Sequence, residues 1–121
     1  MRTENDDDLS QLEQIDGTII LKTLKARYEK DIIYTSCGDM LIAMNPCKEL
    51  PIFGENQHNL YDWKKFSEIL APHVFQTAAR AFRRIHESKK DQVIIVTGES
   101  GAGKNREHKI HGETFRSHVS K

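Results

Sequence analysis

The feature that most constrains the fold is an uncharged apolar run that leads directly into a glycine-rich loop. Residues 92–97 read Gln-Val-Ile-Ile-Val-Thr, and the sequence Gly98-Glu99-Ser100-Gly101-Ala102-Gly103-Lys104 follows at once. A short apolar run without alternation predicts a central parallel strand that is buried on both faces. The loop matches glycine, any four residues, glycine and lysine, a spacing that lets consecutive backbone N–H groups point at one anion. Strand and loop together predict an α/β fold with a phosphate-binding loop.

The residue types in this loop fit that chemistry. Glycines let the backbone curl around a phosphate, and the positive end of the following helix adds to the attraction. In such loops the lysine reaches the β- and γ-phosphates and the next hydroxyl ligates magnesium. Here Asn105 stands at that last position, so the candidate magnesium ligand is a longer carboxamide with a different geometry. The candidate phosphate-binding residues are Gly98, Glu99, Ser100, Gly101, Ala102, Gly103, Lys104 and Asn105. A glycine-rich turn without any ligand is the alternative.

The rest of the pattern predicts two helices and a hairpin. One helix is expected over residues 18–30 and another from Pro72 onward, since proline is tolerated in a first helical turn. Apolar runs at residues 32–35 and 40–44 are separated by a short polar turn, which predicts two antiparallel strands. Residues 47–59 are expected to form a surface loop. The predicted buried stripes are Ile20, Leu21, Leu24 and Tyr28 in the first helix, and Val74, Phe75, Ala78, Phe82 and Ile85 in the second. The predicted solvent faces carry Lys22, Lys25 and Arg27, and Arg80, Arg83 and Arg84.

Composition limits the classes of function. A chain of 121 residues has the size of one ordinary domain, so at most one folding unit is expected. Its 18 Lys and Arg residues balance 18 Asp and Glu residues, which argues against a nucleic-acid partner. Cys37 and Cys47 lack a Cys-x-x-Cys spacing, and there is neither a signal peptide nor an apolar run of membrane-spanning length. We expect a cytoplasmic protein with reduced thiols.

Four landmarks, in order, resemble the motor domain of myosins. The loop from Gly98 to Lys104 is similar to the myosin P-loop at every position. Ile33-Tyr34-Thr35 and Gly38-Asp39-Met40-Leu41-Ile42-Ala43-Met44-Asn45-Pro46 resemble the strand pair before the myosin adenine loop. Leu50-Pro51-Ile52-Phe53 resembles the end of that loop, and Pro72-His73-Val74-Phe75 resembles the start of the helix before the P-loop strand. The resemblance covers about residues 9–104 and implies a P-loop NTPase-like α/β fold, with helices around an incomplete mixed sheet.

The resemblance also implies a function. Myosins are actin-activated ATPases, so it implies ATP and Mg²⁺ as cofactors, actin filaments as the partner and a place in the cytoskeleton. By the same resemblance, Asn45, Pro46 and Lys48 would frame the adenine. Phe53 stands where many myosins have a tyrosine against the base, so stacking is kept while the hydroxyl's hydrogen bond is lost. No catalytic residue is assigned.

The chain departs from the family after Lys104. Asn105-Arg106-Glu107-His108-Lys109 does not continue the family pattern, and neither Asn-x-Asn-Ser-Ser-Arg nor Asp-x-x-Gly-Phe-Glu, the two switch patterns, is present. We expect a truncated head that does not hydrolyse ATP alone, whose last seventeen residues come from a splice or gene-model boundary. The expected organisation is a disordered acidic N-terminus (1–8), a partial motor domain (9–104) and a divergent polar tail (105–121).

Three alternatives stay open. The chain could act only as a non-catalytic module that binds nucleotide or protein. A small P-loop kinase or GTPase fits less well, because those folds place the loop near the start of the domain. His108, His111 and His118 invite a metal site, but no cysteine is near, so solvated side chains are expected. The 93–96 strand would also lack neighbours, which predicts a marginal, aggregation-prone chain.

Overall fold

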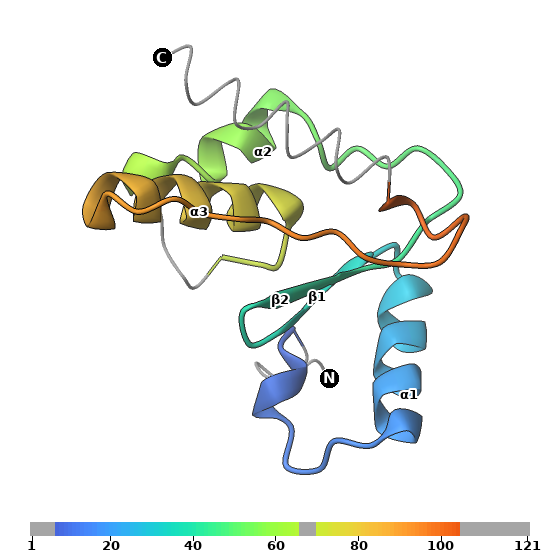
Figure 1. Ribbon diagram of the computed structural model, residues 1–121. Coiled ribbons are helices and arrows are strands. Elements are labelled where there is room, and N and C mark those ends of the chain that lie inside the picture. The colour runs from blue at the N-terminus through green and yellow to red at the C-terminus, as the bar shows by residue number, and fades with distance from the viewer. Residues whose placement is uncertain (1–6, 66–69, 105–121) are drawn as a thin grey trace. The chain divides into compact units, whose positions relative to one another are not determined.

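The computed structural model describes residues 7–65 and 70–104 (Figure 1). The elements are η1 (Leu9–Gln11), α1 (Gly17–Tyr28), β1 (Tyr34–Cys37), β2 (Met40–Ala43), α2 (Glu55–Leu60), η2 (Trp63–Lys65) and α3 (Val74–Ser88). Where one folding unit was expected, the chain divides into two compact units. The first comprises Met1–Leu50 with Ala71–His73, and the second comprises Pro51–Leu70 with Val74–Lys121.

The first unit is built on the hairpin of β1 and β2. The strands are antiparallel, with Tyr34 opposite Ala43 and Cys37 opposite Met40. Gly38 lies in the turn with φ 61°, a left-handed conformation that glycine adopts without steric cost. The predicted hairpin is therefore confirmed, although its first strand begins later than predicted, at Tyr34.

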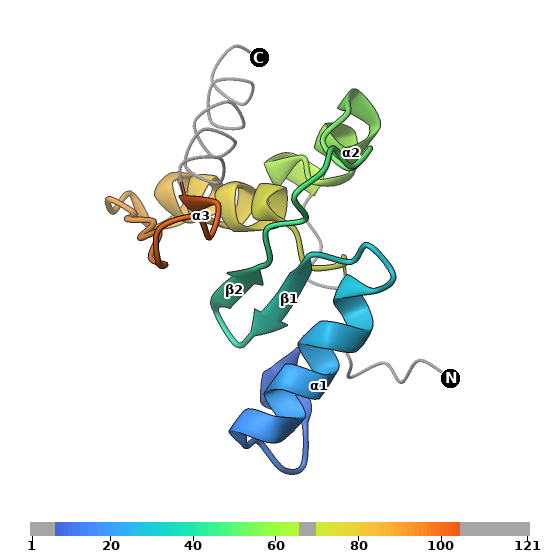
Figure 2. The ribbon, with the colours of Figure 1, turned by 90° about the vertical axis from the view of Figure 1, so that its right-hand side faces the viewer.

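Helix α1 belongs to the same unit (Figure 2). Asp16 caps its N-terminus, because the side-chain carboxylate accepts a hydrogen bond from the Ile19 N–H at 2.9 Å. The predicted helix is confirmed, but its faces are partly wrong. Leu21, expected in the buried stripe, is 69% exposed, whereas Arg27, expected in solvent, is 6% exposed.

The buried Arg27 connects the start of the chain to the hairpin. Its Nη1 lies 2.7 Å from Asp7 Oδ1 in an ion pair. Its Nε donates to Thr35 Oγ1 at 2.9 Å, and its Nη2 donates to the Tyr34 carbonyl oxygen at 2.8 Å. A buried cation needs this full set of acceptors to offset its lost hydration.

Asp8 makes a second connection to the hairpin. Its backbone bridges Ser36 in a parallel arrangement, and its Oδ1 accepts from the Gly38 N–H at 3.1 Å and from the Ser10 N–H and hydroxyl. Burial acts to raise the pKa of Asp8, but these hydrogen bonds outweigh it and hold the pKa below its usual value. Asp7 and Asp8 were assigned to the disordered terminus and are instead part of the fold; residues 1–6 lie outside the described ranges.

The second unit has Phe75 at its centre. The ring is 2% exposed, stacks on His58 with centroids 4.0 Å apart, and meets Phe53 and Tyr61 edge to face. His58 comes from α2, a helix inside the segment that was predicted to be a loop. That prediction is wrong for Glu55–Leu60, because this short helix carries no buried stripe and no side-chain cap that a sequence pattern could reveal.

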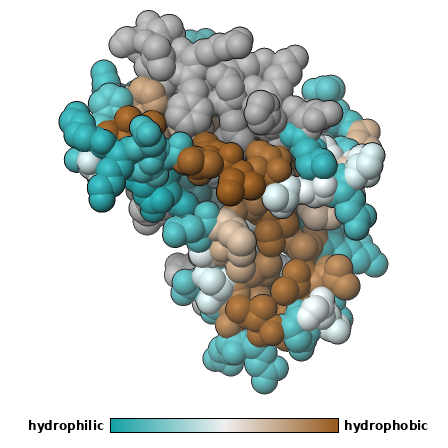
Figure 3. Space-filling view, in the orientation of Figure 1, coloured by the Kyte–Doolittle hydropathy of each residue, from teal (hydrophilic) through white to brown (hydrophobic). Residues whose placement is uncertain are grey.

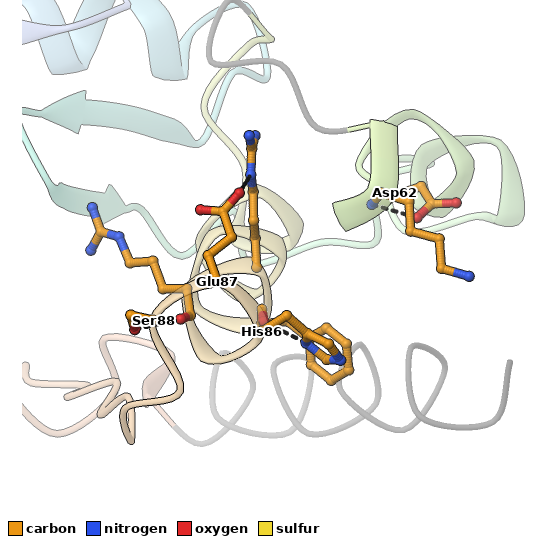
Figure 4. A network of polar contacts seen from close by, with 8 residues as sticks. Asp62, His86, Glu87 and Ser88 are labelled. Carbon is orange, nitrogen blue, oxygen red and sulfur yellow. Dashed lines mark hydrogen bonds and ion pairs between the residues drawn. The ribbon is translucent and has the colours of Figure 1, made fainter.

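Helix α3 confirms the second predicted helix. Val74, Phe75 and Ala78 are buried as expected, whereas Ile85 near the other end is 37% exposed. Figure 4 shows the end of this helix, where the His86 ring nitrogen contacts the Phe82 carbonyl oxygen at 3.1 Å. On the solvent face of α3, Arg83 forms an ion pair with Glu87, and the Ser88 hydroxyl donates to the Arg84 carbonyl oxygen. Figure 4 also shows a contact outside the helix, where the Lys64 N–H donates to the Asp62 side chain.

The run at residues 92–97 is not the buried central strand that its composition predicts. Among the described residues, β1 and β2 form the sheet, and this run pairs with neither. Val93 is 82% exposed and Ile95 is 79% exposed, and hydrophobic side chains are visible on the molecular surface (Figure 3). The prediction is wrong because a β-branched run becomes a strand only when neighbouring strands supply backbone partners. The described fold is thus a set of helices with a small two-stranded antiparallel sheet.

Candidate functional site

The glycine-rich loop curls as its sequence predicts. Gly101 has φ 84° and Gly103 has φ 96°, so two glycines adopt the left-handed conformation within three residues. The Ala102 N–H donates to the Glu99 carbonyl oxygen at 3.1 Å and closes a tight turn between them. Any side chain at either glycine would strain this backbone.

Lys104 lies back across the start of the loop. A Cβ atom placed on Gly98 would be 3.3 Å from Lys104 Cγ and 3.4 Å from Ala102 Cβ. Glycine at position 98 therefore allows the lysine stem to cross the loop, while the Lys104 residue itself stays exposed. The described residues thus supply a curled backbone and an exposed cation, two features that binding of a phosphate group would require. Asn105, the candidate magnesium ligand, lies outside the described residues.

Three of the four adenine candidates follow β2 in the first unit. The Tyr28 hydroxyl donates to the Asn45 carbonyl oxygen at 3.2 Å, and Asn45 Oδ1 accepts from the Cys47 N–H at 3.0 Å. Cys47 has φ 55°, so the backbone turns sharply just after Pro46. The Asn45-Pro46 corner is thus held from both sides, by the end of α1 and by its own side chain.

Lys48 completes this corner through an ion pair. Its Nζ lies 2.8 Å from Asp31 Oδ1, and both side chains are more than half exposed. The hydrogen bond to Asp31, followed by the attraction of its charge, raises the pKa of Lys48. Asp31 lies in the turn after α1, with φ 60°. The sequence pattern had not singled out Tyr28 or Asp31 for this role: Tyr28 was assigned to a buried stripe, and no motif pointed to Asp31.

The fourth adenine candidate, Phe53, belongs to the second unit together with the glycine-rich loop. Its ring is half-buried and lies 6.0 Å from the Phe75 ring, edge to face. The adenine candidates are therefore divided: Asn45, Pro46 and Lys48 lie in one unit and Phe53 lies in the other.

The described residues show neither a candidate metal site nor a helix that could span a membrane. Within residues 7–65 and 70–104, no group of three His, Cys, Asp or Glu side chains could hold a metal ion. The histidines that invited a metal site, His108, His111 and His118, lie outside these ranges. Of the helices in the described part of the chain, none has both the length and the apolar character needed to cross a membrane.

Comparison with known proteins gives one family. The family described as myosin head (motor domain) matches residues 6–113. The match extends beyond Lys104, and so it includes part of the segment that was expected to diverge from the family. Both the glycine-rich loop and the Asn45-Pro46 corner lie inside the matched region.

Individual relatives agree with the family match. The chain is 42% identical over 103 residues to myosin IA heavy chain of Dictyostelium discoideum, covering 85% of this chain and 10% of the relative. It is 45% identical over 98 residues to myosin type-2 heavy chain 2 of Schizosaccharomyces pombe, covering 81% and 5%. It is 41% identical over 104 residues to unconventional myosin-Ia of Rattus norvegicus, covering 86% and 12%. The chain thus spans between 5% and 12% of the length of these relatives. With the family match covering most of its residues, the chain belongs to the myosin head (motor domain) family.

Proposed function

We propose that this chain is the ATP-binding portion of a myosin, an actin-based cytoskeletal motor that hydrolyses ATP. The observation that carries the proposal is the loop from Gly98 to Lys104, where two left-handed glycines and a back-folded lysine lie inside the family match. In this proposal the loop belongs to a P-loop NTPase-like fold. The proposal places the protein in the cytoplasm with the cytoskeleton, and makes actin filaments the partner of the longer myosin.

The residues have separate roles in this proposal. Backbone N–H groups of the loop bind the phosphate oxygens, except that of Ala102, which donates to the Glu99 carbonyl oxygen. The Lys104 ammonium neutralises the β- and γ-phosphates. Asn105 is the candidate ligand for the Mg²⁺ ion that accompanies ATP. Asn45, Pro46 and Lys48 frame the adenine, and Phe53 stacks on it. Tyr28 and Asp31 position that corner through their contacts to Asn45 and Lys48.

Binding of a fluorescent ATP analogue to the full 121-residue chain tests the proposal. Lys104→Ala removes the charge that faces the phosphates, so we expect affinity to fall by at least about tenfold, the value of one charge-assisted hydrogen bond. Lys90→Ala is the matched control, because it removes an exposed lysine before the loop and leaves the loop intact. Equal affinity of the Lys104→Ala and Lys90→Ala proteins would contradict the proposed role of the loop.

A measurement of ATP hydrolysis distinguishes a motor from a module that only binds nucleotide or protein. The 121 residues contain neither switch pattern, so we expect this polypeptide by itself to hold ATP without turning it over. Phosphate release by the chain should not exceed that of Lys104→Ala under the same conditions. Release that is faster and depends on Lys104 would contradict the expected inactivity, while binding would still support the nucleotide site.

A further inference from the structure

The turn after α1 has an aspartate at a position where glycine is the usual residue. The Asp31 N–H donates to the Tyr28 carbonyl oxygen and the Ile32 N–H donates to the Arg27 carbonyl oxygen, each at 3.0 Å. These are the two hydrogen bonds of a Schellman motif, in which the residue at the position of Asp31 is left-handed and is usually glycine. Asp31 has φ 60°, a conformation that costs a residue with a Cβ atom more than it costs glycine. Helix termination therefore does not explain an aspartate at this position.

Two side chains from this end of α1 reach the Asn45-Pro46 corner. Asp31 Oδ1 lies 2.8 Å from Lys48 Nζ, and the Tyr28 hydroxyl donates to the Asn45 carbonyl oxygen at 3.2 Å. All of these residues belong to the first unit, so both contacts lie within one compact part of the chain. The ion pair is the contact that a glycine at position 31 would remove.

We propose that Asp31 is a positioning residue of the nucleotide site, and that the Lys48 ammonium acts through Asp31 rather than by contacting the nucleotide. This inference rests on the proposed function, in which Lys48 frames the adenine. An ammonium paired with a carboxylate at 2.8 Å has its charge compensated, and moving it to a nucleotide would break that pair. The Lys48 charge thus fixes the position of residues 45–48.

The chemistry of the base favours this role. Adenine carries no charge at neutral pH, so an uncompensated ammonium would gain little charge attraction from lying against it. In the proposed function the phosphate charge is neutralised by Lys104, which belongs to the other unit. Pairing with Asp31 leaves the Lys48 side of the corner electrically balanced. We therefore expect the corner to recognise the base through uncharged groups and through its shape.

Calorimetric titration of the full chain with ATP and with inorganic tripolyphosphate, which has no base, tests the role of Asp31. Asp31→Asn keeps the size of the side chain and removes its charge, so the ratio of ATP affinity to tripolyphosphate affinity should fall about two- to fivefold, as for loss of an exposed ion pair. Taking the ratio cancels the general effect of removing one negative charge. Glu29→Gln is the matched control, because it removes the same charge from an exposed residue of the same turn, and it should leave the ratio unchanged.

The two ligands also separate this inference from the proposed function. An unsubstituted chain that binds neither ATP nor tripolyphosphate would overturn both. A chain that binds both ligands, with the same affinity ratio in Asp31→Asn as in Glu29→Gln, would overturn this inference alone and leave the glycine-rich loop its proposed role.

A double-mutant cycle tests whether Lys48 acts through Asp31. If it does, Lys48→Met, Asp31→Asn and the double variant should lose ATP affinity by the same factor, because each of them removes the same ion pair. A loss in Lys48→Met that exceeds the loss in Asp31→Asn, or that persists in the Asp31→Asn background, would show that the ammonium contacts the nucleotide. That result would overturn the inference.

Asp31→Gly distinguishes a positioning residue from one that only supports the fold. Glycine suits the left-handed turn at least as well as aspartate, so the urea midpoint followed by circular dichroism should stay unchanged or rise. The same variant lacks the ion pair, so its ATP affinity should fall as it does in Asp31→Asn. A lower urea midpoint in Asp31→Gly would make Asp31 a contributor to the fold and would contradict its assignment to the site.

Discussion

The guanidinium group of Arg27 joins three segments of the first unit. It reaches Asp7 at the start of the chain and both the hydroxyl of Thr35 and the carbonyl of Tyr34 in β1, from a position near the end of α1. Only arginine offers several donors in a fixed planar fork, so a lysine could satisfy just one of these acceptors well. The side chain thus connects α1 with β1 and with the segment that contains Asp7.

Arg27→Ala should therefore destabilise the chain strongly. It removes the Arg27 donor from Asp7 and from two β1 acceptors, and losing one member of a largely buried ion pair costs about 3 kcal/mol or more. Lys25→Ala, which removes an exposed cation from the same helix turn, should change the free energy of unfolding by less than about 0.5 kcal/mol. Urea unfolding followed by circular dichroism measures both. Equal midpoints for the two variants would show that the Arg27 contacts contribute little.

Helical periodicity indicated the buried position of Arg27, but its charge led to the assignment to solvent. At 100° per residue Arg27 lies within about 60° of Ile20 and Leu24 and on the opposite side of the helix from Lys22 and Lys25. Whether an arginine is buried depends on acceptors from other segments, and two of these, Asp7 and Thr35, come from parts of the chain that the helix pattern does not include. The loop glycines are the opposite case, because their left-handed conformations follow from a local motif that the sequence contains in full.

At the level of elements, the segment from Asp7 to Gln11 acts as an extra edge for the hairpin. The Ser36 N–H donates to the Asp7 carbonyl oxygen at 2.8 Å, next to the parallel bridge between Asp8 and Ser36. The Asp8 carboxylate then binds the Gly38 N–H in the hairpin turn. Each contact joins this short acidic segment to a different point of β1 or its turn.

Asp8 should make the stability of this connection depend on pH. Because its pKa is lower in the folded chain than its ordinary value of 3.8, the ionised form is favoured by folding. The stabilisation is present above pH 3.8 and is lost as the pH falls through the lower folded pKa. Asp8 also caps the short helix η1, because its side chain accepts from the Ser10 N–H. We expect Asp8→Ala to cost about 1 kcal/mol at pH 7, the usual value for a capping aspartate, and less near pH 2.

Urea titrations at the two pH values measure this effect. Asp39→Ala is the control, since Asp39 is an exposed aspartate in the hairpin turn, next to Gly38. The explanation would be contradicted if the Asp8→Ala deficit were as large at pH 2 as at pH 7.

Elements differed in how far the sequence could predict them. Helices α1 and α3 and the hairpin carry local signals: a capping aspartate, a periodic stripe and a glycine turn. Residues 92–97 carry a local signal as strong as any of these, yet form no strand in the described structure. A helix completes its hydrogen bonds within its own segment, but a strand requires another segment, and its own residues do not specify which one.

For the whole molecule, the division into two compact units bears on how the chain unfolds. Two-state unfolding is usual for a single domain, but a chain with more than one unit need not follow it. Trp63, the one tryptophan in the sequence, belongs to the second unit, where its ring stacks on His86 at 4.3 Å and meets Phe82 edge to face. Its fluorescence therefore reports on that unit, whereas far-ultraviolet circular dichroism reports on helices of both.

We expect these two signals to give different urea midpoints. The unpaired run at residues 92–97 belongs to the unit that contains Trp63, and it predicts marginal stability for that unit. This also favours different midpoints for the two signals. Leu21→Lys should leave both curves in place, since the side chain is largely exposed. Superimposable fluorescence and dichroism curves, with a sharp transition, would show instead that the chain unfolds as one cooperative unit.

The contacts of Asp7 and Asp8 also bear on how the chain folds as it is made. A ribosome delivers these aspartates early, but Asp7 must wait for Arg27, twenty positions later, and Asp8 for Gly38, thirty positions later. Until the hairpin has been synthesised, the contacts of this acidic segment to Ser36 and Gly38 cannot form. Asp7 and Asp8 are therefore translated before their partners in the first unit, and the hairpin turn must leave the ribosome before the two aspartates can complete their contacts.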